Sequence, residues 1–213
     1  GGQYTGVIEF KPDGTHQLYN RTNTEYQFLN IHDIDVDSND VYIGTQGGVV
    51  KKTNNKFIST LKANTVNDIL IDKNKTLWAG TENEGLKKFE NGITVSFNTS
   101  NSGIAGDKIT ALKQDKFGIY WIATINGLSK FDGTSTFIKY NSSNSGLPKN
   151  SIKDMAVNSK GIVWLITDFE LVKFDGGTWK VYKSSNSQLP SSELTRIYID
   201  KSDYIWVGTK DAG

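Results

Sequence analysis

The stretch Asp115-Lys116-Phe117-Gly118-Ile119-Tyr120-Trp121-Ile122-Ala123-Thr124 decides the fold of this chain, because its pattern recurs along the sequence. A turn that starts at Asp leads into a short strand that ends in aromatic-x-small-Thr. The five copies of this ending are Tyr42-Ile43-Gly44-Thr45, Trp78-Ala79-Gly80-Thr81, Trp121-Ile122-Ala123-Thr124, Trp164-Leu165-Ile166-Thr167 and Trp206-Val207-Gly208-Thr209. The aromatic residues are 36, 43, 43 and 42 residues apart. A fixed period of this length indicates an internal structural repeat.

Each repeat contains four short segments typical of β-strands. An apolar segment ending in Asp or Asn precedes the turn, and the aromatic-x-small-Thr segment follows it. A third segment, often Gly-Leu-x-Lys-Phe, and an Asn-Gly or Asp-Gly turn lead to a fourth segment. Such turns between short alternating runs are strong hairpin signals. The third segments are residues 6–10, 48–52, 85–89, 127–131 and 170–174.

These strands predict an all-β protein, a β-propeller of five four-stranded antiparallel blades. Radial stacking covers both faces of each sheet, which a lone sheet of this size would expose. A β-solenoid or a β-sandwich is the alternative, but solenoid repeats are shorter and sandwiches do not repeat in sequence. The chain begins at a third strand and ends after a second strand. We therefore expect one domain, residues 1–213, in which the N-terminal pair closes the ring by completing the blade begun by residues 194–209.

Composition excludes several classes of function. The 213 residues contain 24 Lys and Arg, 23 Asp and Glu, no Cys and two His. A formal net charge of +1 gives no general field for nucleic acid, so we expect no nucleic-acid partner. Disulfides and thiolate chemistry are impossible, and no His-rich zinc site can form. We expect no cofactor, no metal and, because no apolar run is long enough, no membrane span.

The repeat resembles the two-component regulator propeller repeat, in which Trp-x-Gly-Thr is followed by Gly-Leu-x-Lys-Phe. The resemblance extends over all five units, although Tyr42 replaces Trp and Ala123 and Ile166 replace Gly. It implies a sensor-type propeller, of the kind found in bacterial two-component systems that often respond to polysaccharide fragments. Together with the Asn/Ser/Thr-rich linkers, it implies a periplasmic or extracellular location in a bacterium.

A binding site is expected on the axial face, where the first strands begin and the second-to-third loops lie. The side chains expected there could meet the donors and acceptors of a small polar ligand, an oligosaccharide or a partner protein. The candidate residues are His32, Asp33, Asn67, Asp68, Glu82, Lys153, Asp154, Asp168 and Arg196. Asp33, Asp68 and Asp154 occupy equivalent positions, so a structural role in capping backbone groups competes with ligand contact. His32, Lys153, Asp168 and Arg196 break the repeat and are the better functional candidates.

Three functions remain open from the sequence. The first is a non-catalytic ligand-binding or sensing propeller, with carbohydrate as a candidate ligand. The second is a structural or protein–protein interaction propeller of a secreted or surface protein. The third is a propeller-type lyase, which would need a positioned base such as His32 and a charge stabiliser. No motif requires catalysis, so we expect no catalytic residues. The Trp positions in the second strands are expected to pack between blades and not to stack on sugars.

Overall fold

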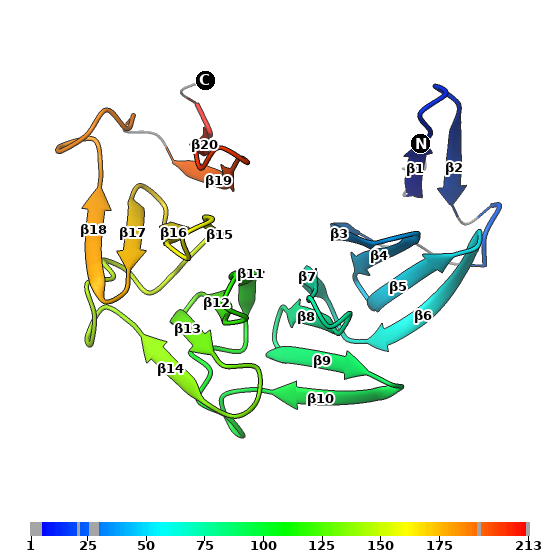
Figure 1. Ribbon diagram of the computed structural model, residues 1–213, viewed down its shortest axis with the longest axis horizontal. Helices are drawn as coiled ribbons and strands as arrows, with labels where there is room; N and C mark the ends of the chain where they lie inside the picture. Colours follow the sequence, from blue (N-terminus) through cyan, green and yellow to red (C-terminus); the bar gives the residue numbers. More distant parts are fainter. Residues whose placement is uncertain (1–5, 21, 26–29, 191–192, 212–213) are drawn as a thin grey trace.

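Residues 6–20, 22–25, 30–190 and 193–211 are described by the computed structural model, and within them the chain forms twenty β-strands and no helix. The strands make four four-stranded antiparallel sheets and two two-stranded sheets. Figure 1 shows the sheets side by side along an arc, with the first strand of each repeat innermost. The all-β fold and the propeller arrangement of the sheets are therefore as predicted.

The four complete sheets are the blades. The first blade contains β3 (Ile31–Asp37), β4 (Asp40–Thr45), β5 (Gly48–Thr53) and β6 (Lys56–Lys62). The second contains β7 (Val66–Ile71), β8 (Leu77–Thr81), β9 (Leu86–Glu90) and β10 (Ile93–Phe97). The third contains β11 (Ile109–Gln114), β12 (Tyr120–Thr124), β13 (Gly127–Phe131) and β14 (Phe137–Tyr140). The fourth contains β15 (Asp154–Val157), β16 (Val163–Ile166), β17 (Leu171–Asp175) and β18 (Thr178–Tyr182).

The two remaining sheets are half-blades at the ends of the arc. One pairs β1 (Gly6–Phe10) with β2 (His16–Asn20), and the other pairs β19 (Leu194–Ile199) with β20 (Ile205–Thr209). No pairing joins them among the described residues, and Figure 1 shows a gap between β20 and β1. The structure thus has four complete blades and two separate halves, and the predicted closure of the ring stays a prediction.

In the first three blades, the threonine of the aromatic-x-small-Thr segment closes the hairpin between the second and third strands. The Thr124 hydroxyl donates to the Gly127 carbonyl at 2.9 Å, and Thr45 and Thr81 make the equivalent bond to Gly48 and Gly85. All three Thr side chains are buried. A buried hydroxyl needs such a partner, which explains why Thr recurs at this position of the repeat.

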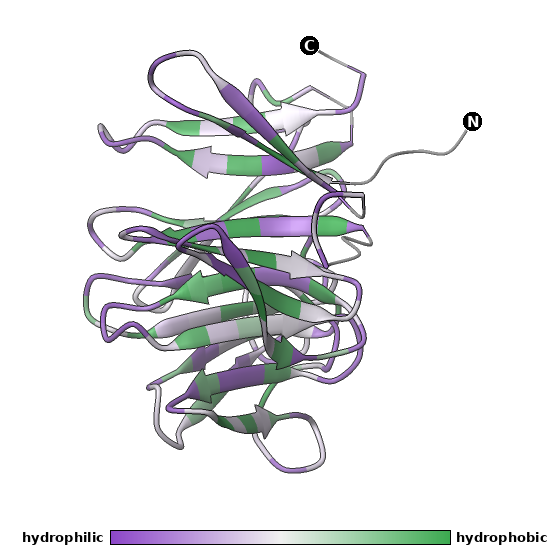
Figure 2. Ribbon diagram, turned by 90° about the vertical axis from the view of Figure 1, so that its right-hand side faces the viewer, coloured by the Kyte–Doolittle hydropathy of each residue, from purple (hydrophilic) through white to green (hydrophobic). Residues whose placement is uncertain are grey.

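Apolar side chains fill the spaces between neighbouring blades. Trp78, Ile109 and Phe131 belong to one such cluster, between the second and third blades. Trp121, Met155 and Phe174 belong to another, between the third and fourth. Along many strands in Figure 2, hydrophobic and hydrophilic residues alternate, as expected for strands whose side chains point to opposite faces. The blades are therefore held together face to face by apolar contacts.

The tryptophans of the second strands confirm their predicted packing role where a neighbouring blade covers them. Trp78 is 1% exposed and Trp121 is 4% exposed, whereas Trp206 on β20 is 61% exposed. The half-blade β19–β20 packs on the fourth blade through one face only, so its other face borders the gap. The half-blade β1–β2 packs in the same one-sided way on the first blade, through Val7 and Tyr19.

Candidate functional site

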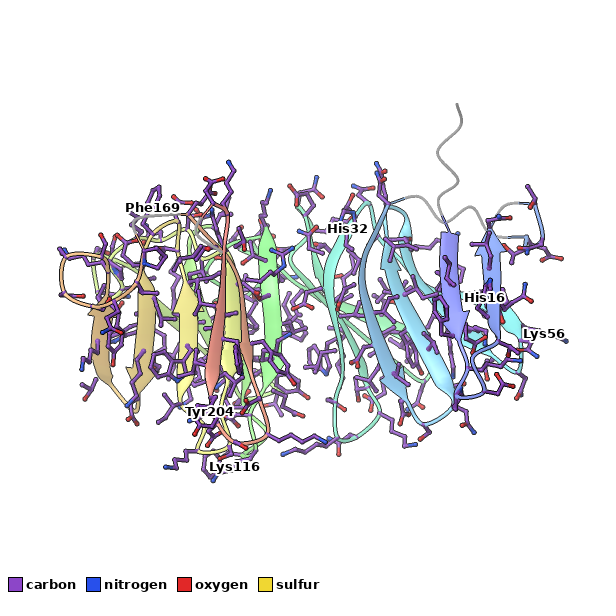
Figure 3. The ribbon with its side chains drawn as sticks, turned by 90° about the horizontal axis from the view of Figure 1, so that it is seen from above. His16, His32, Lys56, Lys116, Phe169 and Tyr204 are labelled. Carbon is purple, nitrogen blue, oxygen red and sulfur yellow. The ribbon has the colours of Figure 1, made fainter. Side chains whose placement is uncertain are left out.

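A cavity of about 850 Å³ lies along the inner strands of the arc. It is lined by residues of β3, β7, β11, β15 and β19 and by three residues, Glu82, Lys108 and Lys153, of the adjoining loops. Figure 3 places His32 near one face of the molecule, together with Phe169, and Lys116 and Tyr204 near the opposite face. We call the cavity along the inner strands the axial cavity. Its volume lies in the range of known small-molecule sites.

Eight of the nine residues predicted from the sequence line the axial cavity. They are His32, Asp33, Asn67, Asp68, Glu82, Lys153, Asp154 and Arg196. The ninth, Asp168, is not among its lining residues, but its carboxylate lies 3.0 Å from the ammonium group of Lys153. The structure therefore brings the predicted residues together, because the repeat places equivalent positions at the same level of each inner strand.

The aspartates at equivalent positions link each inner strand to the next. Asp33 accepts a hydrogen bond from the backbone N–H of Ile69 at 2.9 Å. Asp154 accepts one from Ile197 at 3.0 Å, 43 residues further along the chain. In the third blade the same position is Ala111, which cannot make this bond. The structural role considered for this position is thus present, since each Asp satisfies a backbone group of the neighbouring blade.

Asp68 is the most buried charged group at the cavity, with 8% of its surface exposed. It accepts a 2.5 Å hydrogen bond from the backbone N–H of Leu112. Burial above all, opposed by Lys113 and assisted by the neighbouring Asp33, raises the pKa of the Asp68 carboxyl to about 7. Burial disfavours the charged form of a carboxyl group, so Asp68 changes its charge near neutral pH.

A polar network joins the second and third blades at the edge of the axial cavity. The side-chain amide of Asn67 donates to Glu82 and to the backbone carbonyl of Ile109, both at 2.9 Å. Lys108 donates to the other oxygen of Glu82 at 2.5 Å. These hydrogen bonds, that of Lys108 first, hold the pKa of the Glu82 carboxyl below its usual value. Glu82 is therefore ionised and its orientation is fixed.

Lys153 forms a second charged cluster on the fourth blade. Its ammonium group lies between Asp168 and Glu193. Burial opposes the charge on Lys153, but the hydrogen bonds to Glu193 and Asp168 outweigh it and raise the pKa of the lysine. Lys153 therefore stays protonated and lies between two carboxylates.

His32 and Arg196 are the predicted residues with the fewest structural contacts. Both are exposed at the cavity. Arg196 donates only to the carbonyl of its own neighbour, Thr195, among the described hydrogen bonds, and none of these bonds involves the His32 side chain. Side chains of this kind are free to contact a ligand, unlike the aspartates that hold the blades together.

Sequence reasoning missed nine residues that line the cavity, among them Lys108, Lys113 and Tyr198. Lys108 lies one residue before an inner strand, and the other two lie two residues beyond the Asp position within it. Tyr198 is 64% exposed and takes the place held by Leu70 in the second blade and Ala156 in the fourth. This departure from the repeat on an inner strand was the signal that could have identified it.

The described residues contain neither a cluster suited to a metal ion nor a helix suited to spanning a membrane. No group of three or more His, Cys, Asp or Glu side chains among them could hold a metal ion. No helix of the described chain is long and apolar enough to span a bilayer. The polar side chains of the axial cavity offer both hydrogen-bond donors and acceptors.

Comparison with solved structures gives the class of protein. The extracellular domain of the candidate one-component system BT4673 of B. thetaiotaomicron is 18% identical, with a TM-score of 0.63 over 98% of this chain and 37% of that one. PorZ, a surface component of the type-IX secretion system of Porphyromonas gingivalis, is 17% identical, with a TM-score of 0.71 over 100% and 36%. Virginiamycin B lyase of Staphylococcus aureus is 13% identical, with a TM-score of 0.74 over 96% and 70%.

At these identities the likeness shows the fold alone: the chain is a β-propeller. It spans little more than a third of the BT4673 domain and of PorZ. The family model described as two component regulator propeller matches residues 60–83 and 188–211, which contain β7 and β8 and then β19 and β20. The chain therefore carries two-component regulator propeller repeats, as its sequence pattern predicted. No curated protein was found to match it.

Proposed function

We propose that this chain is a non-catalytic binding module that recognises a polar ligand, an oligosaccharide above all, in the axial cavity. The observation that carries this proposal is the cavity itself, of about 850 Å³, lined by the inner strands of four blades and one half-blade. It presents carboxylates, ammonium groups, an amide, a hydroxyl and a guanidinium group. Such a set matches a ligand that offers many donors and acceptors without net charge.

The exposed residues of β19 are the expected contacts. Arg196 and Tyr198 both line the cavity and both are exposed. A sugar ring binds well against an aromatic face with a planar hydrogen-bond donor beside it. The carboxylates of Asp33 and Asp154 already accept backbone hydrogen bonds, so they shape the floor of the site.

A glycan array followed by titration calorimetry tests this proposal. We expect the chain to bind at least one neutral oligosaccharide, and Arg196→Ala to weaken that binding about tenfold, which is 1.4 kcal/mol. Lys116→Ala is the matched control, because Lys116 lies on the opposite face (Figure 3). This variant should bind the oligosaccharide as tightly as the wild type. Binding to no glycan at all would favour the alternative function, a structural or protein–protein interaction propeller.

The absence of catalysis is part of the proposal. A lyase needs a base held near the substrate proton, commonly by a second group. His32 is exposed and makes no described hydrogen bond to a carboxylate. Two of the solved structures that resemble the fold are named as streptogramin B and virginiamycin B lyases, so a lyase remains the third candidate. Any turnover of a cyclic ester by the chain would argue against a purely binding role.

We also propose a periplasmic or extracellular location and a closed ring. The repeat family and the printed descriptions of the solved relatives, as extracellular domains and a surface component, support the location. The complementary half-blades support closure: β1–β2 has the pattern of third and fourth strands, and β19–β20 that of first and second. Joined edge to edge, they would make a fifth blade.

A further inference from the structure

A second cavity, of about 450 Å³, lies between the third and fourth blades. Asp115, Phe117 and Trp121 line it from the third blade, and Phe174, Gly176 and Gly177 line it from the fourth. It lies by the turn that contains Lys116, which Figure 3 places on the face opposite His32. It is therefore separate from the axial cavity, and nothing in the proposed function uses it.

The interface between the second and third blades shows what fills the equivalent space. There the Tyr120 hydroxyl donates to the carboxylate of Asp72, and the Tyr120 ring lies 4.6 Å from the ring of Trp78, centroid to centroid. The ring also covers Gly133, where a Cβ atom would come within 2.8 Å of it. The Tyr120 side chain thus fills this interface, with its ring packed against Trp78 and its hydroxyl group hydrogen-bonded to Asp72.

One interface further on, the tyrosine is replaced by a much smaller residue. Val163 is the equivalent of Tyr120: each precedes a repeat Trp and pairs with a Phe of the third strand, Phe174 and Phe131 respectively. Gly176, the equivalent of Gly133, has no atom within 4 Å of where its Cβ would be. The space that the Tyr120 ring takes at the earlier interface is therefore open here.

The carboxylate that would meet the hydroxyl is also in place. Asp115, the equivalent of Asp72, is 5% exposed and borders the cavity. Its Oδ2 atom accepts a hydrogen bond from Trp121 Nε1 at 3.0 Å, whereas Asp72 Oδ2 accepts from both Trp78 and Tyr120. A carboxylate oxygen can accept two such bonds. Among the described contacts, Asp115 Oδ2 therefore has capacity for one more donor.

From this comparison we propose that the second cavity binds a phenol ring. The ring lies against Trp121 and over Gly176, and its hydroxyl group donates to Asp115 Oδ2, as Tyr120 does to Asp72. A hydrogen bond to an ionised acceptor is stronger than one between neutral groups, so a phenol is preferred to an unsubstituted aromatic ring. Two lysines, Lys130 and Lys160, and two aspartates line the cavity, so its formal charges cancel and suit an uncharged ligand.

The phenol could come from a small molecule or from a tyrosine side chain of a peptide. Amide chemical shifts of the labelled chain, followed by NMR during titration with p-cresol and with N-acetyl-tyrosine amide, distinguish the two. We expect p-cresol to shift the amide signals of Phe117, Gly176 and Gly177. Similar shifts with N-acetyl-tyrosine amide assign the site to tyrosine side chains, and shifts with p-cresol alone assign it to small phenols. No shift with either compound overturns the proposal.

Toluene and two variants test the role of the hydroxyl group and of the open space. Toluene, which lacks the hydroxyl, should bind at least fivefold more weakly than p-cresol. Asp115→Asn should weaken p-cresol binding by a similar factor, and Asn is compatible with this turn because Asn158 holds the equivalent position in the fourth blade. Val163→Tyr should fill the cavity and abolish binding. Equal affinity for toluene, or unchanged p-cresol affinity in either folded variant, contradicts the proposal.

Discussion

At the scale of single residues, one aspartate in each of three repeats makes three hydrogen bonds that shape the turn between the first and second strands. Asp115 Oδ1 accepts from the backbone N–H groups of Phe117 and Ile119, and its Oδ2 accepts from Trp121 Nε1. Asp72 and Asp200 make the same set with their own turns and tryptophans. The backbone groups of the turn and the indole N–H are therefore satisfied by one side chain.

The fourth blade departs from this arrangement. Asn158 replaces the aspartate and still accepts from the backbone N–H groups of Lys160 and Ile162. Trp164 Nε1, however, is buried without a hydrogen-bond partner, the one such side-chain atom in the described part of the chain. A buried donor without an acceptor lowers the stability of the fold.

Asn158→Asp should therefore stabilise the protein. The new carboxylate oxygen would accept from Trp164 Nε1, as Asp115 does from Trp121. We expect the free energy of unfolding to rise by about 1 kcal/mol, measured by chemical denaturation at pH 7.

The control for this prediction is a double-mutant cycle with Trp164→Phe, which removes the indole N–H. In that background Asn158→Asp should give no gain. An equal gain in both backgrounds would mean that the added charge, and not the hydrogen bond, stabilises the fold.

Asp68 predicts a pH dependence of stability. The pKa of its carboxyl rises from 3.8 to about 7 on folding, because of burial above all. Below pH 3.8 the group is protonated in both states, and stability is not affected. As the pH rises from 3.8 toward 7, Asp68 ionises in the unfolded chain but stays protonated in the folded protein. The free energy of unfolding therefore falls as the pH rises through this range.

The difference between the wild type and Asp68→Asn isolates this effect from carboxyls with lowered pKa, such as Glu82. The variant should gain stability relative to the wild type as the pH rises from 4 to 7, by at most about 1.4 kcal/mol per pH unit. Urea denaturation across this range measures it. A difference that does not vary with pH would show that Asp68 has an ordinary pKa.

At the scale of strands, the small residue of aromatic-x-small-Thr sets how closely neighbouring blades approach. A Cβ atom at Gly80 would lie 2.5 Å from Cγ2 and 3.0 Å from Cβ of Ile109 in the next blade. At Gly44 the nearest atom would be a γ-methyl of Val66, at 3.1 Å. Ala123 and Ile166 take this position in the third and fourth blades, so the side chain at this contact differs from blade to blade.

Gly80→Ala should destabilise the protein by about 1–3 kcal/mol, because the added methyl overpacks the interface with Ile109. Gly44→Ala is the matched variant and should cost less, since a single methyl of Val66 must give way. Thermal unfolding of the two variants provides the comparison. Equal stability of Gly80→Ala and wild type would show that the second and third blades can move apart freely.

Most strands and turns could be predicted from the sequence, because turn chemistry and side-chain alternation are local. The predicted third strand at residues 127–131 is β13, and the one at residues 170–174 is β17 displaced by one residue. The cavity residues followed from the repeat for the same reason. Lys108 and Lys113 did not, because long side chains reach the cavity from neighbouring positions, and their direction depends on partners in other blades, such as Glu82 and Asp68.

At the scale of the whole molecule, local patterns do not fix how the ends of the arc meet. Counting strands matches β1–β2 with β19–β20, but each half-blade packs on a different neighbour, the first blade and the fourth blade respectively. The distance between them depends on the angle at every blade interface, which is a property of packing between blades and not of any one repeat. The exposed face of Trp206 and Tyr198 is the consequence.

A cysteine pair tests the proposed closure. In the third blade Ile122 pairs with Ser129, and the equivalent residues of the two half-blades are Val207 and Ile8. The chain has no cysteine of its own. If the half-blades join, Ile8→Cys and Val207→Cys would lie within the 4.4–6.8 Å between Cα atoms that a disulfide needs. We expect the double variant to form an intramolecular disulfide on mild oxidation, seen by intact mass at low protein concentration.

The control pair is Ile8→Cys with Ile93→Cys, because Ile93 lies on the outermost strand of the second blade and is 66% exposed. It should not cross-link within one molecule. Closure should also bury Trp206, which is 61% exposed when the half-blades are apart. Acrylamide should then quench its fluorescence less than it quenches that of an exposed tryptophan. If the double variant forms no disulfide and acrylamide quenches Trp206 fully, the arc stays open, as in Figure 1. The apolar face of β19–β20 would then be free to receive another blade.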